Sequence, residues 1–245
     1  LAYNSIVAGD DRGATLHYVN NDQVCHDGGL VLVDAGGESR TMYASDITRT
    51  WPINGKFTED QKVIYNLVLR AQLAVLDAMK PGVAWVDLHR LANKMMTEDL
   101  WKAGFLKADN LQELLDNHIG ALFFPHGLGH SLGLDVHDPP NRDGSFEMID
   151  EPAIRYLRVN TVLQKGMVMT VEPGCYFIPR FLTRAMNDEK QGKYLVREKI
   201  EQFLKFGGVR IEDDVLVTED GIEILTPGVP KTVEEIEELM ASGKN

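Results

Sequence analysis

The run Leu30-Val31-Leu32-Val33-Asp34-Ala35-Gly36-Gly37 decides the fold of this 245-residue chain. Four consecutive apolar residues are typical of a strand buried on both faces, and the glycine pair marks the turn that ends it. The strand ends on Asp34, and a carboxylate buried without a partner is strongly unfavourable. We therefore expect Asp34 to meet a compensating group where this strand ends.

The same pattern returns later in the chain. Residues 167–172 form an apolar run that ends on Glu172, and Pro173-Gly174 turn the chain after it. Residues 209–217 predict another strand, with Glu212 in its middle. Asp46 lies in a further predicted strand, residues 41–50, and residues 14–19 predict one more. Four acids, Asp34, Asp46, Glu172 and Glu212, are thus expected to face one sheet interior.

Helices are predicted between and after these strands. Thr58 and Gln61 form a capping-box pattern that opens an apolar stripe over residues 58–79. Further helical segments are expected at residues 88–100, 111–119, 179–206 and 232–240, and residues 125–144 are expected to form a loop. Strands, then helices, then strands, with no visible boundary, predict one α+β domain over residues 1–245.

The composition excludes several classes of function. Lys and Arg number 25 against 37 Asp and Glu, which gives a net charge of −12. Such a charge repels phosphate backbones and anionic lipid, so we expect neither nucleic acid nor membrane as a partner. Cys25 and Cys175 form no spaced cluster, and no apolar run approaches a membrane span. A cytoplasmic location is expected. Because the chain begins at Leu1 rather than Met, we also expect an upstream part.

One motif points to a different chemistry. Gly129-His130-Ser131-Leu132-Gly133 matches the G-x-S-x-G pattern of a serine-hydrolase nucleophile. That enzyme class needs an acid and then a histidine later in the chain, whereas the last histidine is His137. The motif therefore carries little weight, and Ser131 is expected to serve packing or backbone hydrogen bonds.

Four acidic residues that face the same sheet interior favour a metal site over four separate structural roles. Any one of them alone is more simply a turn or cap residue, and a lone His130 beside glycine is more simply a satisfied loop residue. Together, four like charges in a medium of low dielectric repel one another unless cations neutralise them, and two divalent ions balance them. Carboxylates with one imidazole suit Mn²⁺, Co²⁺ or Zn²⁺ and exclude thiolate-type sites.

At this point the sequence resembles a known family, the Xaa-Pro peptidases, which comprise prolidase and aminopeptidase P among the "pita-bread" metallopeptidases. The resemblance rests on five motifs in the family's order: Asp34-Ala35-Gly36-Gly37, Ser45-Asp46-Ile47-Thr48-Arg49-Thr50-Trp51-Pro52, the loop at residues 126–138, Val171-Glu172-Pro173-Gly174, and Gly208-Val209-Arg210-Ile211-Glu212-Asp213-Asp214. Five ordered motifs over nearly the whole chain are far more specific than any one alone.

The resemblance implies a role for each site residue. The metal ligands would be Asp34, Asp46, His130, Glu172 and Glu212, with Asp46 and Glu212 bridging two ions. Glu172 would also carry the proton from water to the leaving nitrogen. His126 and His137 would contact the substrate carbonyl and stabilise the transition state. His17, Arg158 and Arg210 would lie against the substrate, although both arginines could instead be structural ion-pair partners.

The resemblance further implies curved antiparallel sheets with helices outside, and a dinuclear exopeptidase that takes two divalent ions, Mn²⁺ before Co²⁺ or Zn²⁺. Its substrates would be small peptides with proline second. We prefer the dipeptidase, because residues 126–138, 208–214 and the 179–206 segment match prolidase-like members. The alternatives are an Xaa-Pro aminopeptidase, a non-catalytic peptide- or histone-binding module, and a methionine aminopeptidase. Family members carry an N-terminal domain, absent from this chain, and a homodimer is expected for the full-length protein.

Overall fold

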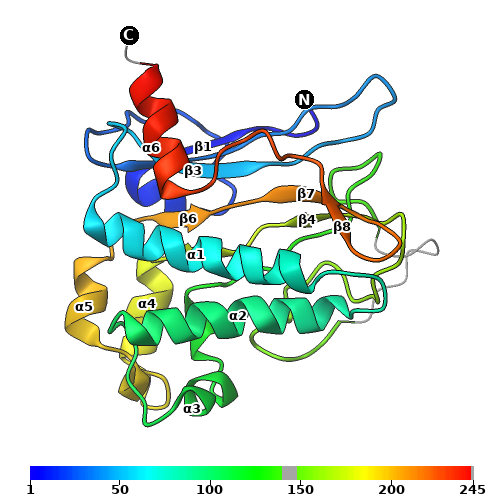
Figure 1. Ribbon diagram of the computed structural model, residues 1–245. Helices are drawn as coiled ribbons and strands as arrows, with labels where there is room; N and C mark the ends of the chain where they lie inside the picture. Colours follow the sequence, from blue (N-terminus) through cyan, green and yellow to red (C-terminus); the bar gives the residue numbers. More distant parts are fainter. Residues whose placement is uncertain (140–147, 244–245) are drawn as a thin grey trace.

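The computed structural model describes residues 1–139 and 148–243, so residues 140–144 of the predicted loop lie outside the described residues. Its strands form three sheets, ordered β1-β2-β3, β4-β7-β8 and β5-β6, and every strand pair within them is antiparallel. Helices α1 and α2 lie side by side along one face of the strands (Figure 1). The predicted α+β class, with antiparallel sheets and helices outside, is confirmed.

The first sheet contains β1 (Ile6–Gly9), β2 (Leu30–Asp34) and β3 (Thr48–Pro52), with β2 in the centre and buried over most of its length. The predicted strand at residues 14–19 is wrong. Residues 14–19 pair with none of the described strands, and β2 is already paired on both edges, by β1 and β3. The chain forms η1 (Asp10–Ala14) instead and then runs irregularly.

The predicted strand at residues 41–50 is only partly right, because β3 begins at Thr48. Before it, the chain turns at Ser39, whose N–H bonds to the Tyr43 carbonyl at 2.9 Å. Asp46 stands outside the ladder, and its backbone N–H donates to the Asp214 carboxylate at 3.1 Å. Asp46 therefore reaches the sheet interior from a loop rather than from a strand.

The other strands are β4 (Val168–Val171), β5 (Gly174–Tyr176), β6 (Gly208–Arg210), β7 (Asp213–Val217) and β8 (Ile222–Ile224). The single strand predicted at residues 209–217 is wrong, because the chain breaks at Ile211 and Glu212. The Ile211 N–H bonds to the Pro173 carbonyl and the Glu212 N–H to the Thr48 carbonyl. The break sends β6 and β7 into different sheets.

The two long helices agree closely with the helices predicted at residues 58–79 and 88–100. Helix α1 (Glu59–Ala78) begins with the predicted capping box, in which Thr58 and Gln61 exchange side-chain and backbone hydrogen bonds. Helix α2 (Trp85–Lys102) packs against it. The apolar stripes of both helices enter one core, which includes the fully buried side chains of Ile64, Val68, Val75, Ala92 and Leu100.

Shorter helices surround this core. They are α3 (Leu111–Asp116), η2 (Ile119–Leu122), α4 (Pro179–Met186), η3 (Gly192–Tyr194), α5 (Arg197–Gln202) and α6 (Val233–Ser242). The helix predicted at residues 111–119 is cut short, because His118 adopts a left-handed conformation with φ 52°. The predicted helical character of residues 179–206 and 232–240 is confirmed. Within the described residues, no helix combines the length and apolar character that a bilayer span requires.

Helix α2 is tied to the segment before Arg158 through His89. The side chain of His89 is fully buried, and its Nε2 donates to the Ala153 carbonyl at 2.7 Å. Its ring stacks on Phe124 with centroids 4.9 Å apart. Burial lowers the pKa of His89 to about 4. The folded protein therefore holds this imidazole neutral at pH values where an unfolded chain would protonate it.

His89 makes stability depend on pH. Since its folded pKa lies below the unfolded value of about 6.5, the unfolded state takes up the proton first as the pH falls. The stabilisation that comes from keeping His89 neutral is complete above the pKa of the unfolded state and is lost as the pH falls towards the pKa of the folded state. This should lower the unfolding free energy by about 2 to 3 kcal/mol between pH 7 and pH 4.5. Urea unfolding of the wild type and of His89→Gln at both pH values should show this extra loss in the wild type. Equal losses would contradict the assignment.

Candidate active site

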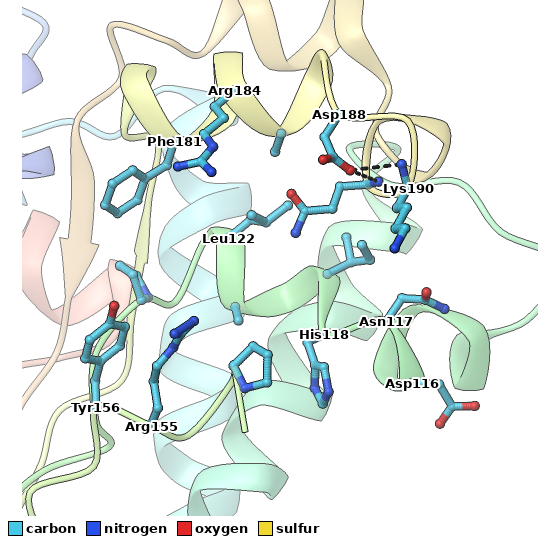
Figure 2. A pocket seen from close by; sticks show the side chains of 16 residues that line it. Asp116, Asn117, His118, Leu122, Arg155, Tyr156, Phe181, Arg184, Asp188 and Lys190 are labelled. Atoms are coloured by element: carbon cyan, nitrogen blue, oxygen red, sulfur yellow. Dashed lines mark hydrogen bonds between the residues drawn. The ribbon is translucent and has the colours of Figure 1, made fainter. Parts of the chain in front are cut away.

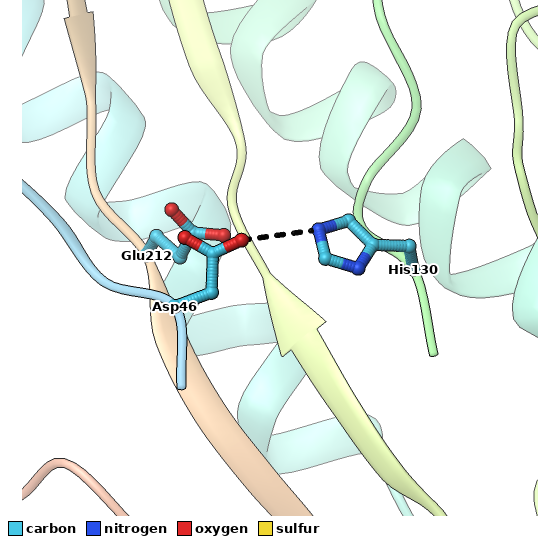
Figure 3. Close-up of side chains that lie close together, drawn as sticks. All are labelled: Asp46, His130 and Glu212. Carbon is cyan, nitrogen blue, oxygen red and sulfur yellow. Dashed lines mark ion pairs between the residues drawn. The ribbon is translucent and has the colours of Figure 1, made fainter. Parts of the chain in front are cut away.

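Asp46, His130 and Glu212 converge at the centre of the molecule. The three residues are 5%, 3% and 1% exposed, and one ligand atom from each lies within 4.8 Å of the others. Figure 3 shows His130 facing Asp46, and His130 Nε2 is 3.4 Å from Asp46 Oδ2. The three residues come from the loop before β3, the loop before β4 and the break between β6 and β7. Only the folded chain brings them together.

Backbone contacts with β4 position His130. A Cβ at Gly129 would lie 2.0 Å from the Thr170 carbonyl oxygen, so only glycine permits this approach. The His130 N–H donates to Thr170 Oγ1 at 3.0 Å, and the Thr170 N–H donates to the His130 carbonyl at 2.9 Å. His130 is thereby held against β4 through its own backbone N–H and carbonyl, which fixes the position from which its imidazole projects.

Glu212 is held from two sides. Thr48 Oγ1 donates to Glu212 Oε2 at 2.6 Å, which fixes the carboxylate. Arg49 Nη1 donates to the Glu212 carbonyl at 2.6 Å, and Arg49 Nη2 pairs with Asp213 at 2.7 Å in a nearly fully buried contact. Arg49 therefore holds the break between β6 and β7 from behind, a role that the sequence did not predict. Asp214, the next acid, accepts the Asp46 N–H.

Asp34 lies beside Asp46, and Tyr3 joins them. The Tyr3 hydroxyl contacts one oxygen of each carboxylate, while Arg210 Nη2 donates to the other Asp34 oxygen. A hydroxyl carries one proton, so it can donate to only one of the two carboxylates at a time. The other close contact between oxygens requires a further proton or a cation. Tyr3 was not predicted.

Glu172 completes the cluster at the end of β4. Its Oε1 is 3.5 Å from His130 Nε2, and its Oε2 is 3.9 Å from His126 Nδ1. These residues open onto a pocket of about 430 Å³, which we call the acidic pocket. All ten predicted site residues line it: His17, Asp34, Asp46, His126, His130, His137, Arg158, Glu172, Arg210 and Glu212.

The four carboxylates of the acidic pocket are poorly compensated. Burial raises the pKa of Glu212 well above its usual range and that of Glu172 to about 7, and the neighbouring carboxylates add to both shifts. Burial also raises the pKa of Asp34, although Arg210 opposes the shift. For His130, burial lowers the pKa, but Asp46 and Glu172 outweigh it and leave it raised. This set of oxygen donors with one imidazole fits divalent cations, which would replace the protons.

The other histidines of the pocket are neutral at pH 7. Burial and Arg210 lower the pKa of His126 to about 3, and burial and His130 lower that of His137 to about 4. His126 Nδ1 donates to the Gly127 carbonyl at 2.7 Å, because a carbonyl can only accept. Its Nε2 therefore accepts from the Tyr176 hydroxyl at 2.9 Å. A substrate oxygen could reach an N–H of His126 only after these partners rearrange.

The two predicted substrate arginines differ. Arg210 is 3% exposed, and its guanidinium donates to Thr48 Oγ1, the Tyr176 hydroxyl and Asp34, so the ion-pair interpretation holds for it. Arg158 is exposed at the mouth of the pocket and forms no ion pair with the described acidic residues. Ser131 contacts Met169 Sδ through its hydroxyl at 3.9 Å, and its hydroxyl has no hydrogen bond to a described histidine.

The chain is similar to known peptidases along almost its whole length. The profile of metallopeptidase family M24 matches residues 1–219. The Xaa-Pro dipeptidase of Homo sapiens is 49% identical over 98% of this chain and 49% of its own length. A "Probable Xaa-Pro aminopeptidase PEPP" of Phaeosphaeria nodorum is 45% identical over 99% of this chain and 51% of its own length.

Solved structures agree with this. Zinc-substituted Escherichia coli aminopeptidase P in complex with product superposes with a TM-score of 0.80 at 38% identity, over 100% of this chain and 48% of that chain. Pseudomonas aeruginosa aminopeptidase PepP gives 0.78 at 42% identity, over 99% and 48%. The chain thus spans about half the length of the relatives that it matches.

The Tyr3 contact can be tested by removing its hydroxyl. Tyr3→Phe leaves Asp34 and Asp46 facing each other without a donor between them, so we expect the metal-free protein to lose about 1 to 3 kcal/mol of unfolding free energy. Tyr18→Phe is the matched control, because Tyr18 also donates to a carboxylate, that of Asp22, but on the surface. It should change stability by less than about 0.5 kcal/mol. Equal losses in chelator-treated urea titrations would refute the buried contact.

Proposed function

The chain belongs to metallopeptidase family M24, and from this premise we propose that it is the catalytic domain of a dinuclear metal-dependent exopeptidase that hydrolyses Xaa-Pro bonds. One observation carries the proposal. Three buried carboxylates, the half-buried carboxylate of Glu172 and one buried imidazole meet in a single pocket, and among the described residues their only close cation partner is Arg210. Such a donor set is unfavourable without cations and well suited to two of them.

Asp34, Asp46, His130, Glu172 and Glu212 are the residues that would hold the ions. Asp46 and Glu212 would serve both ions, as the resemblance to the Xaa-Pro peptidases implies, and the two lie close together beside His130. When bound, two divalent ions supply an activated water at neutral pH and polarise the substrate carbonyl. Mn²⁺ is our first choice, with Co²⁺ or Zn²⁺ possible for the same donors.

The remaining residues of the pocket would act on the peptide. His137 is neutral at pH 7 and exposed at the pocket, so its N–H can stabilise charge on the carbonyl oxygen. His126 would join it only after its contacts with the Gly127 carbonyl and the Tyr176 hydroxyl rearrange. Glu172 would carry the proton from water to the leaving proline nitrogen. Arg158, which forms no ion pair with the described acidic residues, would bind the substrate's C-terminal side, and His17 lines the same pocket. Arg210 would orient Asp34 and line the substrate pocket.

Cleavage before proline requires a dedicated substrate pocket, because proline lacks an amide hydrogen and has a fixed ring. We prefer the Xaa-Pro dipeptidase because relatives of that name are 48–49% identical to this chain, against 45–46% for relatives named as probable Xaa-Pro aminopeptidases. The Xaa-Pro aminopeptidase is the second candidate. A binding module without metals would be expected to lack ligands, whereas all five are present.

The wider setting belongs to the same proposal. Residues 1–245 would act as one catalytic domain within a longer protein that carries an N-terminal domain and forms a homodimer. A cytoplasmic location fits the two free thiols, Cys25 and Cys175. Small peptides with proline at the second position would be its partners, and the net charge of −12 argues against nucleic acid.

Metal removal tests the proposal directly. After chelation, the full-length protein should lose hydrolysis of Gly-Pro and Ala-Pro, and Mn²⁺ or Co²⁺ should restore it, because the pocket supplies no other source of an activated water. Ala-Pro should be cleaved faster than Ala-Pro-Ala if the dipeptidase is right, and the reverse order would favour the aminopeptidase. A metal-loaded protein that cleaves neither peptide would contradict the proposal.

Asp46→Asn tests the bridging position. A neutral amide cannot balance two dications, so we expect the folded variant to retain at most one ion per chain instead of two, with at least about 100-fold lower activity. Asp77→Asn, at an exposed position of α1, should retain both ions. Metal content after dialysis, with circular dichroism as a check on folding, gives the answer. Unchanged stoichiometry in Asp46→Asn would remove it from the ligand set.

A further inference from the structure

A second cavity of about 670 Å³ adjoins the acidic pocket. Pro125, Tyr156 and Phe181 line both spaces, so the two meet there. Helix α4 forms one wall of the second cavity, and η2 with the segment around Arg155 forms the opposite wall (Figure 2). The side chains of Tyr156 and Phe181 are 62% and 47% exposed, so the junction offers apolar surface to anything that crosses it.

This second space, which we call the basic cavity, contains cations that lack acidic partners. Arg155, Arg184 and Lys190 line it, and none of them forms an ion pair with any acidic residue that the structure describes. The guanidinium carbon of Arg155 lies 5.6 Å from the centroid of the Tyr156 ring.

The acids of the basic cavity are engaged elsewhere. Asp188 accepts the backbone N–H groups of Lys190 and Gln191 at 2.9 and 3.0 Å. Asp116 accepts the side-chain amide of Gln112 at 2.7 Å. In a chain with a net charge of −12, unpaired cations that share one cavity are unexpected unless an anion joins them.

The charges of the basic cavity are also segregated. In Figure 2 the guanidinium groups of Arg155 and Arg184 enter from opposite walls, close to Tyr156 and Phe181. Asp188 and Asp116 lie at the other end. The end of the basic cavity that joins the acidic pocket is therefore its positive end.

We propose that the basic cavity is an extension of the substrate site that binds a peptide carboxylate beyond the second residue. The carboxylate would be the C-terminus of a tripeptide or an acidic side chain at the third position. This inference rests on the proposed function and names a substrate class for the same site. A dipeptide would fill the acidic pocket alone, whereas a longer peptide would use both spaces.

The basic cavity offers contacts for both the backbone and the carboxylate of a peptide's third residue. An extended chain advances about 3.3 to 3.6 Å per residue, so a peptide that leaves the acidic pocket meets Tyr156 and Phe181 next. The two arginines behind them present planar forks of N–H donors, which match a carboxylate better than lysine does. The amide analogue of the same peptide would gain the apolar contact but not the charge.

Paired substrates test the inference on the metal-loaded, full-length protein. Ala-Pro-Glu-amide against Ala-Pro-Gln-amide measures the side-chain carboxylate, and Ala-Pro-Ala against its C-terminal amide measures the terminal one. We expect kcat/KM to favour the carboxylate member of at least one pair. Arg155→Gln and Arg184→Gln should each reduce that preference about two- to five-fold, the range for exposed charge pairs, and should leave Ala-Pro unchanged.

Arg180→Gln is the matched control, because Arg180 is an exposed residue of the same helix α4 that lines neither space. It should leave the preference intact. Equal kcat/KM within both pairs, resistance of every tripeptide while Ala-Pro is cleaved, or an equal effect of Arg180→Gln would each overturn the inference and spare the proposed function. Failure to cleave Ala-Pro as well would contradict both.

Discussion

Mutual repulsion among four carboxylates that share one pocket, three of them buried and one half-buried, is the constraint that the surrounding structure has to satisfy. Asp34, Asp46, Glu172 and Glu212 line one pocket, and burial raises the pKa of three of them, Asp34, Glu172 and Glu212. Hydroxyl donors from Tyr3 and Thr48 and the single guanidinium of Arg210 offset only part of this cost. In the proposed function, divalent cations would offset the remainder, so the same repulsion that destabilises the carboxylate cluster would favour the binding of metal.

The irregularities of the fold follow from this constraint. A continuous strand over residues 209–217 would alternate its side chains between two faces, whereas the break at Glu212 places three consecutive acids in three environments. Glu212 faces the pocket, Asp213 pairs with the buried Arg49, and Asp214 accepts the Asp46 N–H. Asp46 likewise leaves its strand to reach the pocket. At both positions, regular strand geometry is interrupted where an acidic side chain enters the acidic pocket.

The sequence predicted the parts that local pattern controls. Apolar runs that end on Asp34 and Glu172, the capping box at Thr58 and the glycine before His130 all have local causes, and all are found. The missed parts depend on tertiary pairing. Strand β1 has only four residues, and it is β1 rather than residues 14–19 that pairs with β2. Tyr3 has no local signal, since its partners lie 31 and 43 residues away.

The proposed metal centre consists of two ions held by four carboxylates and the imidazole of His130. Anomalous diffraction from crystals of the Mn²⁺-loaded protein tests it most directly. We predict two anomalous peaks, roughly 3.5 to 4 Å apart, with Asp46 and Glu212 contacting both. Asp34, Glu172 and His130 should complete the coordination. A single peak, or two peaks that these side chains do not contact, would contradict it.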